Sequence, residues 1–187
     1  MKALCCIVAA GVCGLALAPE QAVAQGATTV AVDATIGAGF GKGGEFYHRS
    51  LHGARVAASL RRYSPTRFGF FGEIALDALS IGSGDLAVCY FDPRGGCLPV
   101  YPELWGPTVT GGLIAQPTDR VEARIGVGGG AYLASGAHVG ALVSQADLAF
   151  FPVRRIGLIA GARWIAVPRY HGDRLSILPW AIGLRFR

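Results

Sequence analysis

The sequence predicts an all-β fold, an eight-stranded antiparallel up-and-down transmembrane β-barrel, from three observations. Eight stretches alternate large apolar residues with small or charged ones at a period of two, so each describes a strand with one apolar and one polar face. Short turns and longer connections alternate between these stretches. Charged residues make up 16% of the chain, well below the share of about 25% in soluble domains.

The N-terminus precedes the predicted barrel and is typical of a secretory signal peptide. Lys2 is followed by an apolar run over residues 3–18, and Ala22-Val23-Ala24 is a small-residue cleavage site. Lipoprotein processing at Cys13 is an alternative, although Val12 is not the small residue that usually precedes such a cysteine. Residues 1–24 are therefore predicted to be the signal peptide, and residues 25–187 the single barrel domain.

The first four strands are predicted at residues 30–40, 51–63, 68–78 and 107–116. In the first strand the even positions from Val30 to Phe40 are apolar or small, and Asp33 lies on the opposite face. The second and third repeat this pattern, with Leu60 and Ile74 on their apolar faces. The fourth is less regular, because glycine and threonine dilute its alternation.

The last four strands alternate more clearly. They are predicted at residues 121–133, 142–150 and 158–164 and at the C-terminal stretch, where the apolar face carries Trp180, Ile182, Leu184 and Phe186. An uncharged run from Ile125 to Ala146 is long enough for a transmembrane helix, but its six glycines and mid-span His138 favour two strands and a loop.

The connections predict two different rims. Tight turns fall near Ser64, Pro117 and Pro152, and longer loops at residues 41–50, 80–106, 135–140 and 168–176. Arginines flank the tight turns, and we expect them to anchor lipid head groups: Arg62, Arg67, Arg154 and Arg155. The net charge of +5 in an exported chain favours anionic lipid over nucleic acid as a partner.

The polar face of the strands carries isolated charges of both signs among small residues, which suits a narrow, packed lumen. These predicted lumen charges are Asp33, Arg55, Glu73, Asp77, Glu122, Arg124, Asp147, Arg163 and Arg185. Aromatic residues collect at the strand ends and predict two girdles: Tyr63, Phe68, Phe150, Phe151 and Phe186 near the short turns, and Phe40, Trp105, Tyr132 and Trp164 near the loops. A soluble lipocalin-like carrier would turn the charged face outward and is the alternative.

This pattern resembles the OmpA and OmpX type of small outer-membrane barrel over essentially the whole mature chain. The most specific likeness is the C-terminal strand, because Trp180, Ile182, Leu184 and Phe186 are similar to the family's assembly signal. Arg187 departs from it, since family members commonly end on the aromatic residue. The resemblance implies a monomer in the outer membrane of a Gram-negative envelope, with outer-membrane lipids and the barrel-assembly machinery as partners.

Two cysteines, Cys89 and Cys97, remain after signal cleavage and predict a disulfide within the longest loop. Without a nearby histidine they do not supply four zinc ligands, so no metal and no cofactor is expected. The glycine-rich stretch around Lys42 lacks the Ser or Thr of a phosphate loop.

A filled eight-stranded barrel predicts a non-enzymatic protein that supports the envelope or binds an extracellular ligand through its loops, not a diffusion pore. The candidate loop surface comprises Tyr90, Phe91, Arg94, Tyr101 and Trp105; protection of a long loop from proteolysis is the simpler alternative role for the disulfide. The competing class is an enzyme that modifies lipid A through His48 and Ser50, with Glu45 or Asp85 as the orienting carboxylate.

Overall fold

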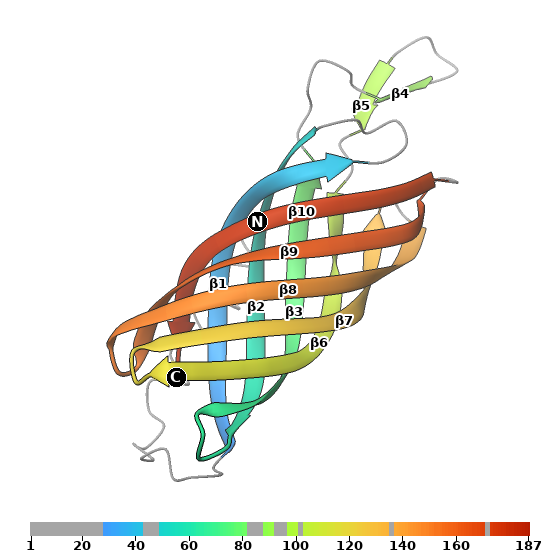
Figure 1. Cartoon of the computed structure of the whole chain (residues 1–187). Coiled ribbons are helices and arrows are strands. Elements are labelled where there is room, and N and C mark those ends of the chain that lie inside the picture. Colours follow the sequence, from blue (N-terminus) through green and yellow to red (C-terminus); the bar gives the residue numbers. More distant parts are fainter. Residues whose placement is uncertain are drawn as a thin grey trace.

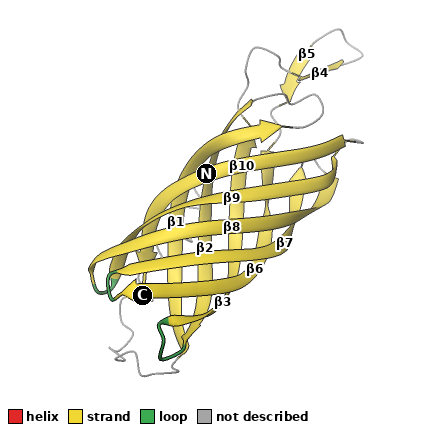
Figure 2. Ribbon diagram, in the orientation of Figure 1, coloured by secondary structure: helices red, strands yellow, loops and turns green. Residues whose placement is uncertain are grey.

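The computed structural model describes residues 28–42, 49–81, 88–91, 97–100, 103–134, 137–170 and 173–187. Eight strands form a closed barrel (Figures 1 and 2): β1 (Thr28–Lys42), β2 (Arg49–Tyr63), β3 (Phe68–Ile81), β6 (Glu103–Thr118), β7 (Val121–Ala134), β8 (Ala137–Val153), β9 (Ile156–Tyr170) and β10 (Asp173–Phe186). A separate two-stranded sheet, β4 (Val88–Phe91) and β5 (Cys97–Val100), lies between β3 and β6 in the chain. The described part of the chain contains no helix that is long and apolar enough to cross a bilayer.

The barrel strands follow one another around the wall in the order β1-β10-β9-β8-β7-β6-β3-β2, and every pairing is antiparallel. The seam between β1 and β10 is paired from Val32 opposite Phe186 to Lys42 opposite Ser176. Each barrel strand therefore has a partner on both sides, which leaves no open sheet edge in the wall. The predicted eight-stranded up-and-down barrel is confirmed.

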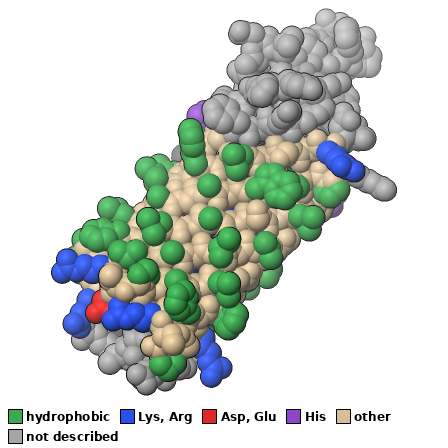
Figure 3. Space-filling view, viewed as in Figure 1, with side chains coloured by type: hydrophobic (Ala, Val, Ile, Leu, Met, Phe, Trp, Pro, Cys, Tyr) green, Lys and Arg blue, Asp and Glu red, His purple; other side chains and the backbone are tan. Residues whose placement is uncertain are grey.

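The wall has an apolar outer surface and a polar inner surface. On the outside, Ile36 is 67% exposed and Val127 is 68% exposed, whereas Asp33 and Glu122 on the inside are 1% and 0% exposed. In Figure 3 apolar side chains are spread over the wall on the visible face. A soluble lipocalin-like barrel would need the opposite arrangement, so the composition of the two faces assigned them correctly, and the outer surface suits lipid.

The three tight turns lie at one rim, and the structure shortens all four of the predicted loops at the other. Strand ends trim the loops at 41–50 and 80–106 by a few residues, and the other two lose most of their length. Residues 137–140 belong to β8 and residues 168–170 to β9, so the predicted loops at 135–140 and 168–176 were too long. Gly140 and Pro168 had been interpreted as loop residues. Pro168 is accommodated because the β9–β10 register shifts beside it, and a bulge is one of the few places where a sheet tolerates proline.

The strands are 14 to 17 residues long, more than the roughly 9 to 11 that span a bilayer. Toward the loop rim the outer surface becomes polar, with exposed His52 opposite Ser80 on β2 and β3 and exposed His138 on β8. At these positions the outer surface is therefore polar, which would suit a part of the wall outside a hydrocarbon layer.

Candidate functional site: the barrel lumen

The lumen gathers all nine of the charged residues predicted for it. They come from seven strands, in chain order Asp33, Arg55, Glu73, Asp77, Glu122, Arg124, Asp147, Arg163 and Arg185, and β6 adds Thr108 and Thr110. Period-two alternation places them all on the inner face. Closure of the barrel then brings side chains that are far apart in the sequence into contact with one another.

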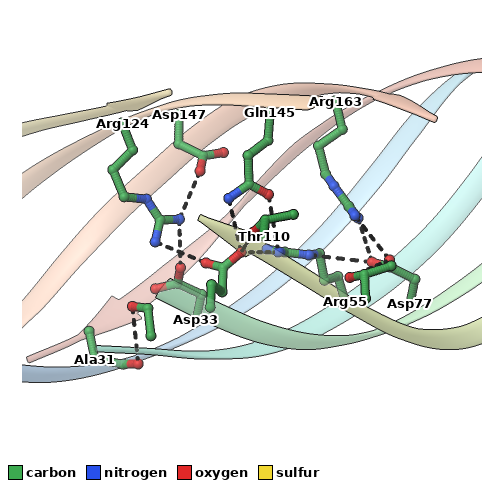
Figure 4. A network of polar contacts seen from close by, with 12 residues as sticks. Ala31, Asp33, Arg55, Asp77, Thr110, Arg124, Gln145, Asp147 and Arg163 are labelled. Carbon is green, nitrogen blue, oxygen red and sulfur yellow. Dashed lines mark hydrogen bonds and ion pairs between the residues drawn. The ribbon is translucent and has the colours of Figure 1, made fainter. Parts of the chain in front are cut away.

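Arg124 on β7 is the centre of this network (Figure 4). Its guanidinium donates to three carboxylates, those of Asp33 at 3.0 Å, Glu73 at 2.9 Å and Asp147 at 2.7 Å. Gly161 on β9 makes room for one of them, because a Cβ there would lie 2.2 Å from a carboxylate oxygen of Asp147. The Arg124 charge is thus satisfied from three strands at once, as a buried cation requires.

Asp77 is the hub on the side toward the loops. Arg163 donates to both of its carboxylate oxygens, Arg55 approaches it at 3.3 Å, and the hydroxyl groups of Tyr132 and Thr108 donate at 2.8 and 3.2 Å. Arg55 also pairs with Glu73, which links this hub to the centre of the network. Both carboxylate oxygens of Asp77 are therefore engaged.

Glu122 is the hub toward the short turns. It accepts hydrogen bonds from Arg61 at 2.8 Å, from the Tyr63 hydroxyl at 2.7 Å and from Arg185, whose guanidinium also bonds Asp33. Arg187 lies 3.5 Å from Glu122. This end of the lumen is therefore closed by several cations around one buried carboxylate.

An apolar layer fills the lumen on the loop side of the network. It comprises the inward-facing residues Leu51, Leu79, Leu104, Tyr132, Ala141, Val143, Ile165, Val167, Leu175 and Ile177. All ten are buried, and all come from the loop-side ends of their strands. Water that enters from the loop rim meets this layer before it reaches the charges.

The contacts leave little room for a substrate. A cavity of about 30 Å³ borders Thr35, Arg55, Asp77 and Arg163, which is space for about one water molecule. Among the described residues, no three His, Cys, Asp or Glu side chains are placed to hold a metal ion. The lumen groups are arranged to neutralise one another, and no carboxylate hub points a free oxygen into an accessible cleft.

Sequence reasoning missed several members of this network. Arg61 lies six positions after Arg55 on β2, and Arg187 lies two positions after Arg185. An even separation in a strand puts two residues on the same face, so alternation alone could have placed both arginines in the lumen. The Arg187 guanidinium lies over the Phe151 ring, 3.3 Å from its centroid. Arg187, which departs from the family's terminal pattern, thus packs into the short-turn end of the barrel.

The predicted aromatic girdles are partly wrong. Phe68, Phe150, Trp105 and Trp164 face outward as expected, but Tyr63, Phe151 and Tyr132 point into the lumen and are buried. The tyrosines find buried carboxylates there for their hydroxyl groups. The Phe151 ring instead packs over Gly157 on β9, where a Cβ would lie 2.7 Å from it. Position at a strand end did not predict the direction of these rings.

The candidate loop surface falls partly outside the described residues. Tyr90 and Phe91 lie in β4, Trp105 lies in β6 with its side chain on the outer wall, and Arg94 and Tyr101 are outside the described residues. His48, Glu45 and Asp85 of the enzymatic alternative are also outside them, and Ser50 is described only as part of β2.

The β4–β5 register bears on the predicted disulfide. Cys89 is opposite Pro99 and Cys97 is opposite Phe91, so the cysteines are diagonal neighbours, not direct partners. Diagonal Cα atoms lie about 7 to 8 Å apart, beyond the usual disulfide range of about 4.4 to 6.8 Å. A bond between them needs a shift of this hairpin, and the disulfide stays a prediction.

No protein-family model and no curated protein matches the chain, but solved structures do. Neisserial surface protein A is 11% identical, with 86% of this chain and 98% of that chain covered at a TM-score of 0.56. Ail of Yersinia pestis, in complex with the heparin analogue sucrose octasulfate, is 14% identical, with 84% and 99% covered at a TM-score of 0.49. The outer membrane protein OprG from Pseudomonas aeruginosa is 6% identical, with 87% and 96% covered at 0.47.

The fold is that of the small outer-membrane β-barrels. In outer-membrane barrels of this fold the short turns face the periplasm and the longer loops face outward, so the short-turn rim around Glu122 corresponds to the periplasmic end of such a barrel. The last strand of this barrel presents Trp180, Ile182 and Leu184 to the outside while pairing with both β1 and β9. The features that carried the sequence resemblance thus lie at the closing seam.

Proposed function

We propose that this protein is a non-enzymatic outer-membrane barrel that anchors its loops at the cell surface and stabilises the envelope, with a lumen that conducts nothing. One observation carries the proposal: the lumen is occupied along its length by the ion-pair network and by the apolar layer above it. An eight-stranded barrel has room for side chains and for little else.

The proposed partners follow from the surfaces of the barrel. The apolar band is proposed to contact outer-membrane lipids, and the outward-facing last strand to be recognised by the barrel-assembly machinery. The wall has no free strand edge, which favours a monomer. An extracellular ligand would bind the loop side, where the long connection between β3 and β6 carries the β4–β5 sheet. No nucleic acid is proposed as a partner.

Single-channel recording in a planar bilayer tests the sealed lumen. The full chain is isolated from the outer membrane of a Gram-negative host, and a heat-dependent mobility shift on a detergent gel establishes that the recorded material is a folded barrel. We expect no conductance above that of the bare membrane. Steady channels from material that shows the mobility shift would overturn the sealed lumen. The mass of the same material tests signal cleavage, which should leave Gln25 as the first residue.

The enzymatic alternative has its own test. Lipid A is extracted from cells that express the unmodified chain and from cells that express a variant with His48 or Ser50 replaced by alanine. Mass spectrometry should find the same lipid A in all of them. A modification of lipid A that depends on both residues would replace the non-enzymatic proposal.

The most specific part of the proposal is a disulfide between Cys89 and Cys97. Thiol alkylation without reductant, followed by mass spectrometry of the barrel from the outer membrane, should find both cysteines protected. Alkylation of both would mean that the hairpin keeps the diagonal register and that the loop is not cross-linked.

A further inference from the structure

Each tight turn at the periplasmic rim carries an arginine at the same structural position. Arg67, Arg120 and Arg155 are the residues immediately before β3, β7 and β9. The backbone carbonyl of each accepts a hydrogen bond from an amide of the next hairpin or strand around the wall, at 2.8, 2.7 and 3.0 Å respectively. The backbone hydrogen bonds between neighbouring strands therefore continue into all three turns, and they fix the backbone position of these arginines at the rim.

Two further arginines lie at the same rim. Arg62 is on β2 directly opposite the outward-facing Phe70, and Arg154 precedes Arg155 in the β8–β9 turn. All five side chains are exposed. In Figure 3 basic side chains gather at the lower left end of the barrel, where the short turns lie. We call Arg62, Arg67, Arg120, Arg154 and Arg155 the arginine rim.

Protein carboxylates neutralise little of the arginine rim. Among the described residues, Asp119 is the exposed acid of these turns, and it lies 3.3 Å from Arg67. The other four arginines form no ion pair within the described part of the chain. This contrasts with the lumen, where the arginines contact buried carboxylates. The rim therefore offers positive charge to something outside the protein.

An apolar collar adjoins the arginine rim on the outer wall. Its members are exposed and lie at the short-turn ends of their strands: Phe68, Phe70, Phe150, Val153 and Ile156. Arginine stems pack along apolar surface while the guanidinium groups reach the polar boundary. The geometry thus places the guanidinium groups at the depth of lipid head groups.

The backbone of Arg67 is independent evidence that the side chain matters. Its φ of 64° is in the left-handed region, which glycine or asparagine adopts at lower cost than a residue with a long side chain. Turn geometry alone therefore does not explain an arginine at this position. The Arg67 guanidinium donates to the Pro117 carbonyl at 3.2 Å and lies 3.3 Å from Asp119, so part of it holds the neighbouring turn while the exposed remainder faces outward.

We propose that the arginine rim binds the phosphate groups of anionic phospholipids in the leaflet on the short-turn side. Guanidinium is planar and donates two parallel hydrogen bonds to a phosphate, and a head group with net negative charge gains more from a basic ring than a zwitterionic one. This inference rests on the proposed outer-membrane location and adds the lipid class and the leaflet to it.

Native mass spectrometry of the full-length folded barrel, released from detergent containing equal amounts of phosphatidylglycerol and phosphatidylcholine, tests the proposal. The unmodified barrel should retain phosphatidylglycerol at least fivefold over phosphatidylcholine, since one arginine near a membrane surface contributes about that factor. The triple variant Arg62→Gln, Arg154→Gln, Arg155→Gln should lower this ratio several-fold, because only Arg67 and Arg120 of the rim remain. Arg174→Gln, an exposed arginine of β10 near the loop rim, is the matched control and should keep it.

Arg67→Gly separates lipid binding from folding, because it relieves the left-handed strain while removing one guanidinium. It should fold at least as well as the unmodified chain and still lower phosphatidylglycerol retention. Excess inorganic phosphate should leave retention unchanged, which distinguishes a lipid from free phosphate. No preference in the unmodified barrel, or a preference that the triple variant leaves unchanged or that falls equally in Arg174→Gln, would overturn the arginine rim as a lipid site. Failure to show the heat-dependent mobility shift in either lipid would overturn the outer-membrane proposal instead.

Discussion

The two parts of the lumen exclude water by different chemistry. Toward the short turns the barrel is filled by arginine and carboxylate side chains that share partners, whereas toward the loops it is filled by aliphatic side chains and one tyrosine. In the network, losing one member leaves buried charges with fewer partners, as the loss of Arg124 would leave Asp33 with Arg185 alone among the arginines that it now pairs with. In the apolar layer, losing a methyl group leaves only a small cavity. The same wall thus encloses one region with strongly coupled residues and one with nearly independent residues.

The largest expected effect comes from breaking the network at its centre. Arg124→Met removes a cation that contacts three buried carboxylates and should lower the free energy of unfolding by about 3 to 5 kcal/mol. Urea unfolding of the barrel in lipid vesicles, followed by the heat-dependent mobility shift, measures it. Ile125→Met on the neighbouring outer-face position is the control and should change little. A loss no larger than the control's would mean that water reaches the carboxylates, and that the two regions do not differ as described.

A smaller effect is expected where the two regions meet. Tyr132 belongs to the apolar layer, yet its hydroxyl donates to Asp77 at 2.8 Å. Tyr132→Phe keeps the ring and removes the donor, so it should cost about 1.5 to 3 kcal/mol, the range for a hydrogen bond to a charged group. The cost should shrink in an Asp77→Asn background, where the acceptor no longer carries the charge. An equal cost in both backgrounds would show that Tyr132 contributes packing alone and does not couple the regions.

The alternation of residues along each strand predicts much of the barrel wall, but it does not predict which side chains pair inside the lumen. A period of two decides which residues share a face, and the small and charged residues on one face assign that face to the lumen, so Asp33 and Arg185 could be placed there without knowing their partners. Their pairing depends on the stagger of the closed wall, which joins residues far apart in the chain, such as Arg124 and Asp33. Local alternation contains no such information.

The errors have local causes. Aromatic residues at strand ends were all assigned to the membrane boundary, but Tyr132 has inward parity and a buried acceptor, and parity decides. Gly140 and Pro168 were interpreted as loop residues because both weaken strands in isolation. In the barrel, pairing with Ala131 of β7 holds Gly140 in β8, and a register shift accommodates Pro168 in β9.

The smallest expected effect tests whether the apolar layer is dry. Ile177 is fully buried on β10, and Ile177→Val should lower the free energy of unfolding by about 0.5 to 1.5 kcal/mol. Ile182→Val on the outer face of the same strand is the matched control and should cost less, because lipid tails fill the space. Ile177→Thr then decides the question: threonine has nearly the shape of valine but carries a hydroxyl group, which costs more where no water can reach it. Threonine should therefore be clearly worse than valine at position 177, by the same urea assay. If the two were equal, water would reach the layer from the loops, and the network below it would alone seal the barrel.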